Sequence, residues 1–300
     1  MNLLLTGALK YSEEQLNKLK LLGYEITFVQ DERVPLEVDV SDIDIVVCNG
    51  LFLYNDIVKF KNLKLIQLTS AGLDQVPIDY IKEKDIKLYN AKGVYSIPMA
   101  EWVVAKILEI YKKSKQFYKK QELRKWEKSR DLLELTGKTV SIIGFGDVGT
   151  EVAKRLKAFG VHIAGVGRKN IESEFLDEYY LIGEIDKVLK KSDIVILTVP
   201  LSQETWHLIN KEKIRQMKDD CVLINVSRGE IIDEVALSEG INQHKFLGVA
   251  LDVFGKEPLS KGSPLWSFEN VIVTPHNSFV SDSISTRMFD LIYKNLNNKQ

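Results

Sequence analysis

Short apolar runs alternate with helical patterns in two separate series along the 300-residue chain. The first series has runs at residues 2–7, 24–30, 42–50, 63–72 and 86–93. The second has runs at residues 138–146, 161–167, 192–200, 221–227, 246–254 and 270–276. Helices between continuous apolar strands are typical of parallel sheets covered on both faces. We therefore predict an α/β fold with two doubly wound parallel sheets.

A long helical segment, residues 98–131, separates the two series. Its first part, from Met99 to Ile110, is apolar enough to be buried. Its lysine-rich remainder is interpreted as exposed helix surface or an arm between subunits rather than as a site for polyanions. An amphipathic helix is expected at about residues 283–297. The predicted domains are residues 1–95 plus 279–300 and residues 96–278.

Composition excludes several classes of protein. The formal net charge of −1 argues against a dedicated nucleic-acid binder, which needs a marked basic surplus. No apolar stretch approaches the ~18 residues of a membrane span, and the N-terminal apolar run ends at Gly7, too short for a secretion signal. Cys48 and Cys221 lie far apart in apolar runs, so buried inert thiols are expected and a metal site is not. We expect a cytoplasmic protein without nucleic-acid or membrane partners.

The stretch "SIIGFGDVGTEVAKRLKAFG" places Gly144, Gly146 and Gly149 between an apolar strand and a helical pattern. In this context Gly144 allows a tight turn, Gly146 lets the backbone approach a pyrophosphate, and Gly149 lets helix and strand pack closely. The pyrophosphate would meet the backbone amides of Asp147 and Val148 at the positive end of the helix. The motif predicts a dinucleotide site.

The next strand, "VHIAGVGRKN", indicates which dinucleotide binds. An NAD site usually has a carboxylate at this strand end, about 20 residues beyond the first glycine, to bind the ribose 2′-OH. This chain has Gly167 there, followed by Arg168 and Lys169, which can pair with a 2′-phosphate. We predict NADP(H) as the preferred cofactor, with NAD(H) still possible if these cations are only exposed loop residues.

Four further blocks, "LTSAGLDQVP", "VLINVSRGEIIDEVAL", "GVALDVFGKEPL" and "SPLWSFENVIVTPHNS", follow in fixed order. Together with the glycine motif they resemble the D-isomer-specific 2-hydroxyacid dehydrogenase family over essentially the whole chain. The resemblance implies two Rossmann- or flavodoxin-like domains, with the active site in the cleft between them and a homodimer built on the nucleotide domains.

The family's catalytic trio corresponds to Arg228, Glu257 and His276. Each suits reduction of a 2-oxo acid: Arg228 can hold the carboxylate and polarise the carbonyl, and His276 can donate a proton near neutral pH. Glu257 would bind the other imidazole nitrogen and fix its tautomer. Singly, these residues are as readily explained as a surface ion pair, a Glu-Pro turn or a local hydrogen bond. Together, at the carboxyl ends of predicted strands, they favour catalysis.

The resemblance also indicates contacts around this trio. The substrate carboxylate is expected to meet the backbone amides of Ala71 and Gly72, although an ordinary turn also explains that loop. Asp252 is expected to hold the nicotinamide amide. The further cofactor contacts carried over are Val199, Pro200, Val226 and Ser227.

These features predict an NADP(H)-preferring reductase of a small 2-oxo acid such as glyoxylate or hydroxypyruvate. Asn277 and Phe279 depart from the small residues that commonly follow the family's histidine, which leaves the substrate open. An NAD-linked D-lactate or D-3-phosphoglycerate dehydrogenase is an alternative. The latter is disfavoured because the substrate loop has no basic cluster and the chain ends at Gln300 without a regulatory domain. A nucleotide-sensing scaffold that binds other proteins is the alternative from another class.

Overall fold

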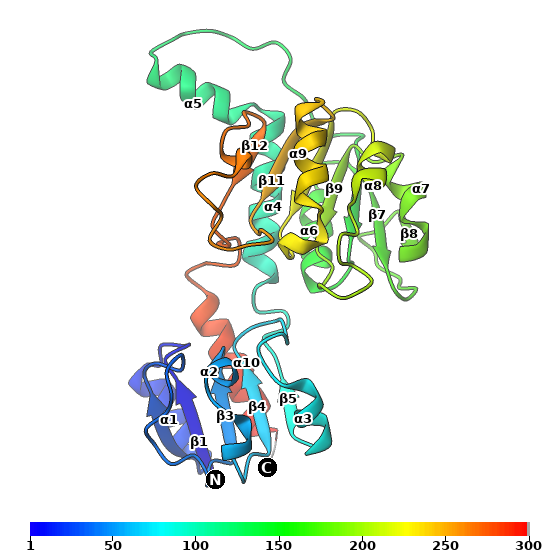
Figure 1. Cartoon of the computed structure of the whole chain (residues 1–300). Helices are drawn as coiled ribbons and strands as arrows, with labels where there is room; N and C mark the ends of the chain where they lie inside the picture. Colours follow the sequence, from blue (N-terminus) through cyan, green and yellow to red (C-terminus); the bar gives the residue numbers. More distant parts are fainter. Residues whose placement is uncertain (299–300) are drawn as a thin grey trace. The chain divides into compact units, whose positions relative to one another are not determined.

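The computed structural model describes residues 1–298 (Figure 1). Its contacts divide the chain into two compact units. Unit 1 comprises Met1–Tyr95 and the C-terminal segment from Ser281, and unit 2 comprises Ser96–Val280. The second crossing thus lies at residues 280–281, where the sequence suggested 278–279. Each unit is built around its own parallel sheet, as predicted.

Unit 1 contains a five-stranded sheet in the order β2-β1-β3-β4-β5. Alternate strand residues face opposite sides, so Val46 packs under α2 and α3 while Ile45 and Val47 pack under α1 and α10. Both faces are therefore covered. The strands are β1 (Asn2–Thr6), β2 (Glu25–Val29), β3 (Ile45–Cys48), β4 (Leu65–Leu68) and β5 (Lys87–Tyr89). The helices are α1 (Glu13–Leu21), α2 (Leu51–Tyr54), η1 (Ile57–Lys59), α3 (Ile78–Glu83) and α10 (Ile284–Asn297).

Unit 2 contains a seven-stranded parallel sheet in the order β12-β11-β10-β9-β6-β7-β8. Val195 and Leu197 of β9 pack against α7, α8 and α9, whereas Ile194 and Ile196 pack against α4 and α6. The strands are β6 (Thr139–Ile143), β7 (His162–Gly167), β8 (Glu178–Leu181), β9 (Ile194–Leu197), β10 (Cys221–Asn225), β11 (Phe246–Leu251) and β12 (Val271–Val273). The helices are α4 (Ser96–Tyr111), α5 (Ser114–Glu122), α6 (Asp147–Lys157), η2 (Ile182–Glu184), α7 (Ile185–Leu189), α8 (Lys211–Gln216), η3 (Gly229–Ile231), α9 (Glu234–Asn242) and η4 (Pro264–Trp266).

Strand order reverses between β9 and β6, because the chain runs outward from β6 to β7 and β8 and then returns to the other side. The loops after β6 and β9 leave the sheet in opposite directions at such a point and open a crevice for a ligand. The carboxyl ends of β6 and β9 are therefore where a dinucleotide site is expected.

Two features of unit 2 differ from the sequence-based prediction. The strand β8 was missed, because its four residues give no alternation long enough to stand out. The segment 98–131, predicted as one long helix, is broken into α4 and α5 at Lys113, which takes a left-handed φ of 53°, and it is not helical after Glu122. The buried part of the segment is α4, as its apolar composition indicated, whereas no residue of α5 is buried.

The two cysteines are free and buried, as predicted. Burial raises the pKa of Cys221 to about 12 and that of Cys48 well above its ordinary value, so neither is a thiolate nucleophile. Over residues 1–298, none of the helices combines the length and hydropathy that a membrane crossing requires.

Candidate active site

The glycine-rich loop lies at the reversal point of the seven-stranded sheet. Gly144, directly after β6, has a φ of +101°, and a Cβ atom there would lie 2.4 Å from the backbone nitrogen of Val199. A Cβ on Gly149 would lie 2.7 Å from the Gly144 carbonyl oxygen, which also accepts a hydrogen bond from Thr198 Oγ1 at 2.6 Å. Both glycines are thus required by the backbone itself, one for the turn and one for the close approach of α6 to β6.

Gly146 differs from these two, because no atom of the described residues, apart from its chain neighbours, lies within 4 Å of the position its Cβ would take. It is the N-cap of α6, and within residues 1–298 no side chain forms a capping hydrogen bond to this helix. The first turn of α6 contains Asp147 and Val148, and its backbone amides lie at the positive end of the helix. Such an arrangement fits a phosphate group, so the residues present are those that a dinucleotide pyrophosphate needs.

The strand next to β6 ends at Gly167, and Arg168 and Lys169 follow it in an exposed turn. Within residues 1–298, neither side chain forms an ion pair. The backbone carbonyl of Lys169 accepts a hydrogen bond from the Tyr179 hydroxyl at 2.7 Å. Two cations thus stand at the strand end where dinucleotide sites bind the adenosine ribose.

Arg228 lies in the turn between β10 and η3. The Asn225 amide donates a hydrogen bond to the Arg228 carbonyl at 2.9 Å, and Arg228 Nη1 donates to the Ser227 carbonyl at 2.8 Å. The Ser227 hydroxyl donates to the carbonyl of Val199 in the loop after β9. The turn is therefore tied both to its own strand and to the loop that packs against Gly144.

Gly229, which sequence reasoning missed, fixes the neighbouring loop. A Cβ on Gly229 would lie 1.8 Å from the backbone carbon of Phe254 and 2.1 Å from the nitrogen of Gly255. The loop after β11 thus passes directly over the turn that carries Arg228. The signal in the sequence was a glycine next to the candidate arginine, in "NVSRGE".

Glu257 and His276 form the hydrogen bond that the sequence predicted. Glu257 Oε2 lies 2.8 Å from His276 Nδ1, and Oε1 accepts the backbone amide of Phe254 at 3.0 Å. An ionised carboxylate only accepts hydrogen bonds, so Nδ1 carries the proton. The imidazole is 40% exposed, which leaves it accessible to a ligand.

Asp252 holds the loop on which His276 lies. Its side chain is fully buried; Oδ1 accepts from Thr274 Oγ1 at 2.5 Å and from the amide of Asn277 at 2.8 Å, and Oδ2 accepts from the amide of Ser278 at 2.9 Å. These bonds stabilise a loop in which His276 takes a left-handed φ of 50°, uncommon for a residue other than glycine. The expected contact of Asp252 with a nicotinamide amide stays a prediction.

Other predicted cofactor contacts lie around these loops. The side chains of Val199, Val226 and Ser227 are buried, whereas that of Pro200 is exposed. Any contact of the two valines with a cofactor would therefore come from their backbones. Phe279, which departs from the usual family pattern, places its ring edge-on to His276 with 5.9 Å between ring centroids.

The predicted substrate loop belongs to unit 1. Asn90 Nδ2 donates to the Ala71 carbonyl at 2.7 Å, and Ser70 Oγ donates to the Gly72 carbonyl at 2.9 Å. Both carbonyls are therefore held. The amides of Ala71 and Gly72 donate to no acceptor in the described part of the chain, and their contact with a substrate carboxylate stays a prediction.

Two of the other histidines have structural partners. His162 Nε2 lies 2.8 Å from Glu178 Oε1, and the ring of His207 stacks on Trp206 at 3.6 Å between centroids. These contacts explain both residues structurally.

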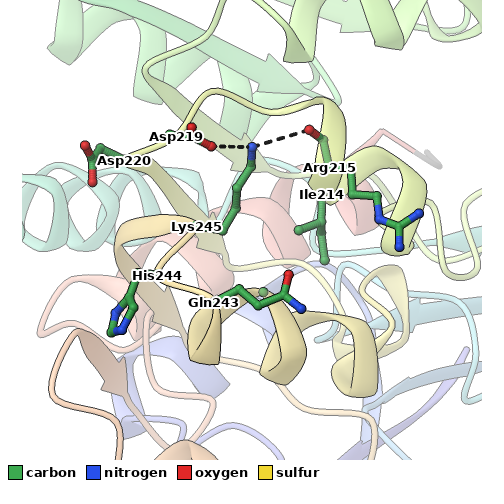
Figure 2. Close-up of a pocket in the computed structure, with 8 residues that line it drawn as sticks. Ile214, Arg215, Asp219, Asp220, Gln243, His244 and Lys245 are labelled. Atoms are coloured by element: carbon green, nitrogen blue, oxygen red, sulfur yellow. Dashed lines mark hydrogen bonds and ion pairs between the residues drawn. The ribbon is translucent and has the colours of Figure 1, made fainter.

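A hollow of about 410 Å³ in unit 2 is lined by the residues drawn in Figure 2, and none of them belongs to the candidate site. Asp219 and Asp220 precede β10 and His244 precedes β11, so the hollow lies at the amino ends of these strands, whereas Arg228 and Glu257 follow their carboxyl ends. Lys245 Nζ donates to Asp219 Oδ1 at 2.8 Å and to the Arg215 carbonyl at 3.3 Å, so its charge is already paired. We assign no ligand to this hollow.

Comparisons with known proteins agree on one kind of enzyme. The family model described as D-isomer specific 2-hydroxyacid dehydrogenase, NAD binding domain, matches residues 104–278. A glyoxylate reductase of Thermofilum pendens is 35% identical over 243 residues, which are 78% of this chain and 71% of that protein. A hydroxypyruvate reductase of Thermotoga maritima is 36% identical over 257 residues, 84% and 83% of the two chains. The solved structure of a D-lactate dehydrogenase from Aquifex aeolicus, complexed with NAD and lactic acid, superposes with a TM-score of 0.79 at 26% identity, covering 98% of this chain and 94% of that one.

Proposed function

Because the chain belongs to the D-isomer-specific 2-hydroxyacid dehydrogenase family of NAD(P)-dependent oxidoreductases, we propose that it reduces a small 2-oxo acid of the glyoxylate or hydroxypyruvate type to the D-2-hydroxy acid. One observation carries the proposal: a histidine oriented by a carboxylate lies in the same unit as a phosphate-fitting glycine loop. The two relatives named for these reductions support the substrate class.

Arg228 binds the substrate in this proposal. Its planar guanidinium can donate two parallel hydrogen bonds, one to the carboxylate and one to the 2-oxo group. The second bond polarises the carbonyl and stabilises the negative charge that develops on its oxygen. A bound dihydronicotinamide supplies the hydride for the carbonyl carbon.

His276 donates the proton that the new alkoxide needs. Since Nδ1 is bonded to Glu257, the other ring nitrogen, Nε2, is the one that meets the substrate oxygen. Glu257 holds the ring in orientation and stabilises the imidazolium through the same hydrogen bond. In the oxidative direction the neutral Nε2 takes the hydroxyl proton.

NADP(H) is the proposed cofactor. Gly167 offers no acceptor for a ribose 2′-OH and no negative charge that would repel a 2′-phosphate, and Arg168 and Lys169 provide cations beside it. Charge-assisted hydrogen bonds to a phosphate contribute about 1.5–3 kcal/mol each, so the preference is expected to reach about 10- to 100-fold.

The test is a panel of 2-oxo acids with both reduced cofactors, followed at 340 nm. We expect the highest kcat/KM for glyoxylate or hydroxypyruvate with NADPH. Higher kcat/KM with pyruvate and NADH would favour a D-lactate dehydrogenase, and turnover only of 3-phosphohydroxypyruvate with NADH a D-3-phosphoglycerate dehydrogenase. A clear preference for NADH contradicts the cofactor proposal. Tight cofactor binding without turnover of any acid would favour the scaffold.

We also propose a homodimer in the cytoplasm. The segment that begins with α5 exposes Tyr118, Leu123 and Trp126, the last with 97% of its surface accessible, and large exposed apolar side chains often mark an interface. The two free, buried thiols are consistent with a reducing compartment.

Light scattering of the purified protein is expected to give the mass of two chains, and replacing Trp126 by serine should shift the mass toward that of one chain. A mass of one chain at micromolar concentration would refute the dimer.

A further inference from the structure

The ring of Tyr179 lies along the end of β7. In the parallel pairing of β7 with β8, Tyr179 lies opposite Gly165. A Cβ on Gly165 would lie 3.0 Å from Tyr179 Cδ2, and a Cβ on Gly167 would lie 2.3 Å from the Tyr179 hydroxyl oxygen. Residues two apart in a strand face the same side, so one tyrosine ring covers two successive glycines. A side chain at Gly167 would require the Tyr179 hydroxyl to move, and one at Gly165 would be tightly packed against the ring and against Leu176.

The hydroxyl of Tyr179 also holds the turn that follows β7. It donates a hydrogen bond to the carbonyl oxygen of Lys169 at 2.7 Å. Burial raises the pKa of this hydroxyl above its ordinary value of 10.0, so the group stays a protonated donor at neutral pH. The bond fixes the backbone of the turn on which Arg168 and Lys169 stand.

These two contacts bear on the 2′ position of the cofactor ribose. A carboxylate that binds a ribose 2′-OH belongs to the side chain at the end of the strand, which here is position 167. The Cβ atom of such a side chain would lie 2.3 Å from the Tyr179 hydroxyl oxygen, well inside van der Waals contact. A carboxylate at position 167 would therefore displace the Tyr179 hydroxyl and break its bond to the backbone of the turn that carries the two cations.

We propose that Tyr179 is a specificity-determining positioning residue, which selects the 2′-phosphate by blocking a side chain at Gly167 and by fixing the Arg168–Lys169 turn. This inference rests on the proposed NADP(H) preference. It goes beyond that preference in assigning it to a side chain of the neighbouring strand rather than to the turn alone.

A purely structural role for Tyr179 is the competing explanation, because β8 is the edge strand of the sheet. The adjacent Tyr180 provides the matched control. Its hydroxyl donates to Glu178 and also contacts Lys191, so it stabilises the same strand without touching the turn after β7.

The experiment measures the dissociation constants of NADP⁺ and NAD⁺ by calorimetry, which needs no substrate. In the unmodified protein NADP⁺ should bind more tightly. Tyr179→Phe removes only the hydroxyl, and the ring carbon that carried it would lie 3.4 Å from a Cβ at position 167. Loss of one neutral hydrogen bond should reduce the NADP⁺/NAD⁺ affinity ratio by about 3- to 10-fold. Tyr180→Phe should leave the ratio unchanged, whatever it does to the melting temperature.

A double-mutant cycle combines Tyr179→Phe with Gly167→Asp. Alone, Gly167→Asp should lower the melting temperature and weaken binding of both cofactors, because the new side chain collides with the hydroxyl. Combined with Tyr179→Phe, it should recover NAD⁺ binding and reduce the affinity ratio by about a further 10- to 100-fold, since the carboxylate now binds the 2′-OH and repels a 2′-phosphate.

The outcomes separate this inference from the proposed function. Equal or tighter binding of NAD⁺ by the unmodified protein would refute the NADP(H) preference, and with it the role of Tyr179. The role of Tyr179 alone would be refuted by two results together. Tyr179→Phe and Tyr180→Phe would leave the NADP⁺/NAD⁺ affinity ratio equally unchanged, and Gly167→Asp would have the same effect in the parent protein as in Tyr179→Phe. A failure to reduce 2-oxo acids would not affect either measurement.

Discussion

Replacing His276 by asparagine is expected to lower kcat for 2-oxo acid reduction by about 10²- to 10⁴-fold, with little change in substrate KM. The substitution removes the proton donor and leaves Arg228 to bind the carboxylate. Asparagine is preferable to alanine because His276 has a φ of 50°, a left-handed conformation that asparagine tolerates. The loop should therefore keep its fold, and the loss should report chemistry.

The matched control is His244→Asn. His244 has a similar φ of 56° but lies in the hollow at the amino ends of the strands (Figure 2). It should keep the parent kcat and melting temperature. Steady-state kinetics from pH 6 to 9 with saturating cofactor make the comparison. If kcat of the His276 variant equals that of the control, the histidine has no part in proton transfer.

The placement of Arg228, Glu257 and His276 at one edge of the sheet was predictable, because parallel strands bring their carboxyl ends to the same edge. β10, β11 and β12 are neighbours in unit 2, so the loops after them had to lie side by side once the strand order was known. Arg228, Glu257 and His276 follow these three strands in turn. The hydrogen bond between Glu257 and His276 is the part of this prediction that the structure confirms at atomic level.

The contacts that hold these residues in place were not predictable in the same way. Whether a buried Asp252 would bind a cofactor or the backbone of its own neighbours depends on distances of a few tenths of an ångström, which residue types do not specify. Gly229 is explained only by the loop that passes over it. Tyr179 lies on a strand too short to be seen as a pattern, and its role depends on what is absent from the strand beside it.

Arg228→Lys is expected to reduce kcat/KM for the 2-oxo acid by about 10²- to 10³-fold, through a higher KM and a lower kcat together. Lysine keeps the positive charge but is a single point donor, so it cannot bind the carboxylate and the carbonyl oxygen at once. The turn should survive, because Asn225 holds it through the backbone carbonyl of residue 228 and Gly229 packs through its backbone. Binding of the oxidised cofactor, measured by calorimetry, should therefore stay near that of the parent.

Arg228→Ala separates charge from geometry. It should lose more activity than the lysine variant, and added guanidinium should restore part of it, since the missing group is planar and its position stays open. The control is Arg215→Lys, which makes the same chemical change in the hollow at the amino ends of the strands, where no substrate is proposed. It should leave kcat/KM unchanged. If Arg228→Lys and Arg215→Lys showed equal kcat/KM, the substrate carboxylate would have to be bound elsewhere. The Arg228 guanidinium would then have no role in the reaction.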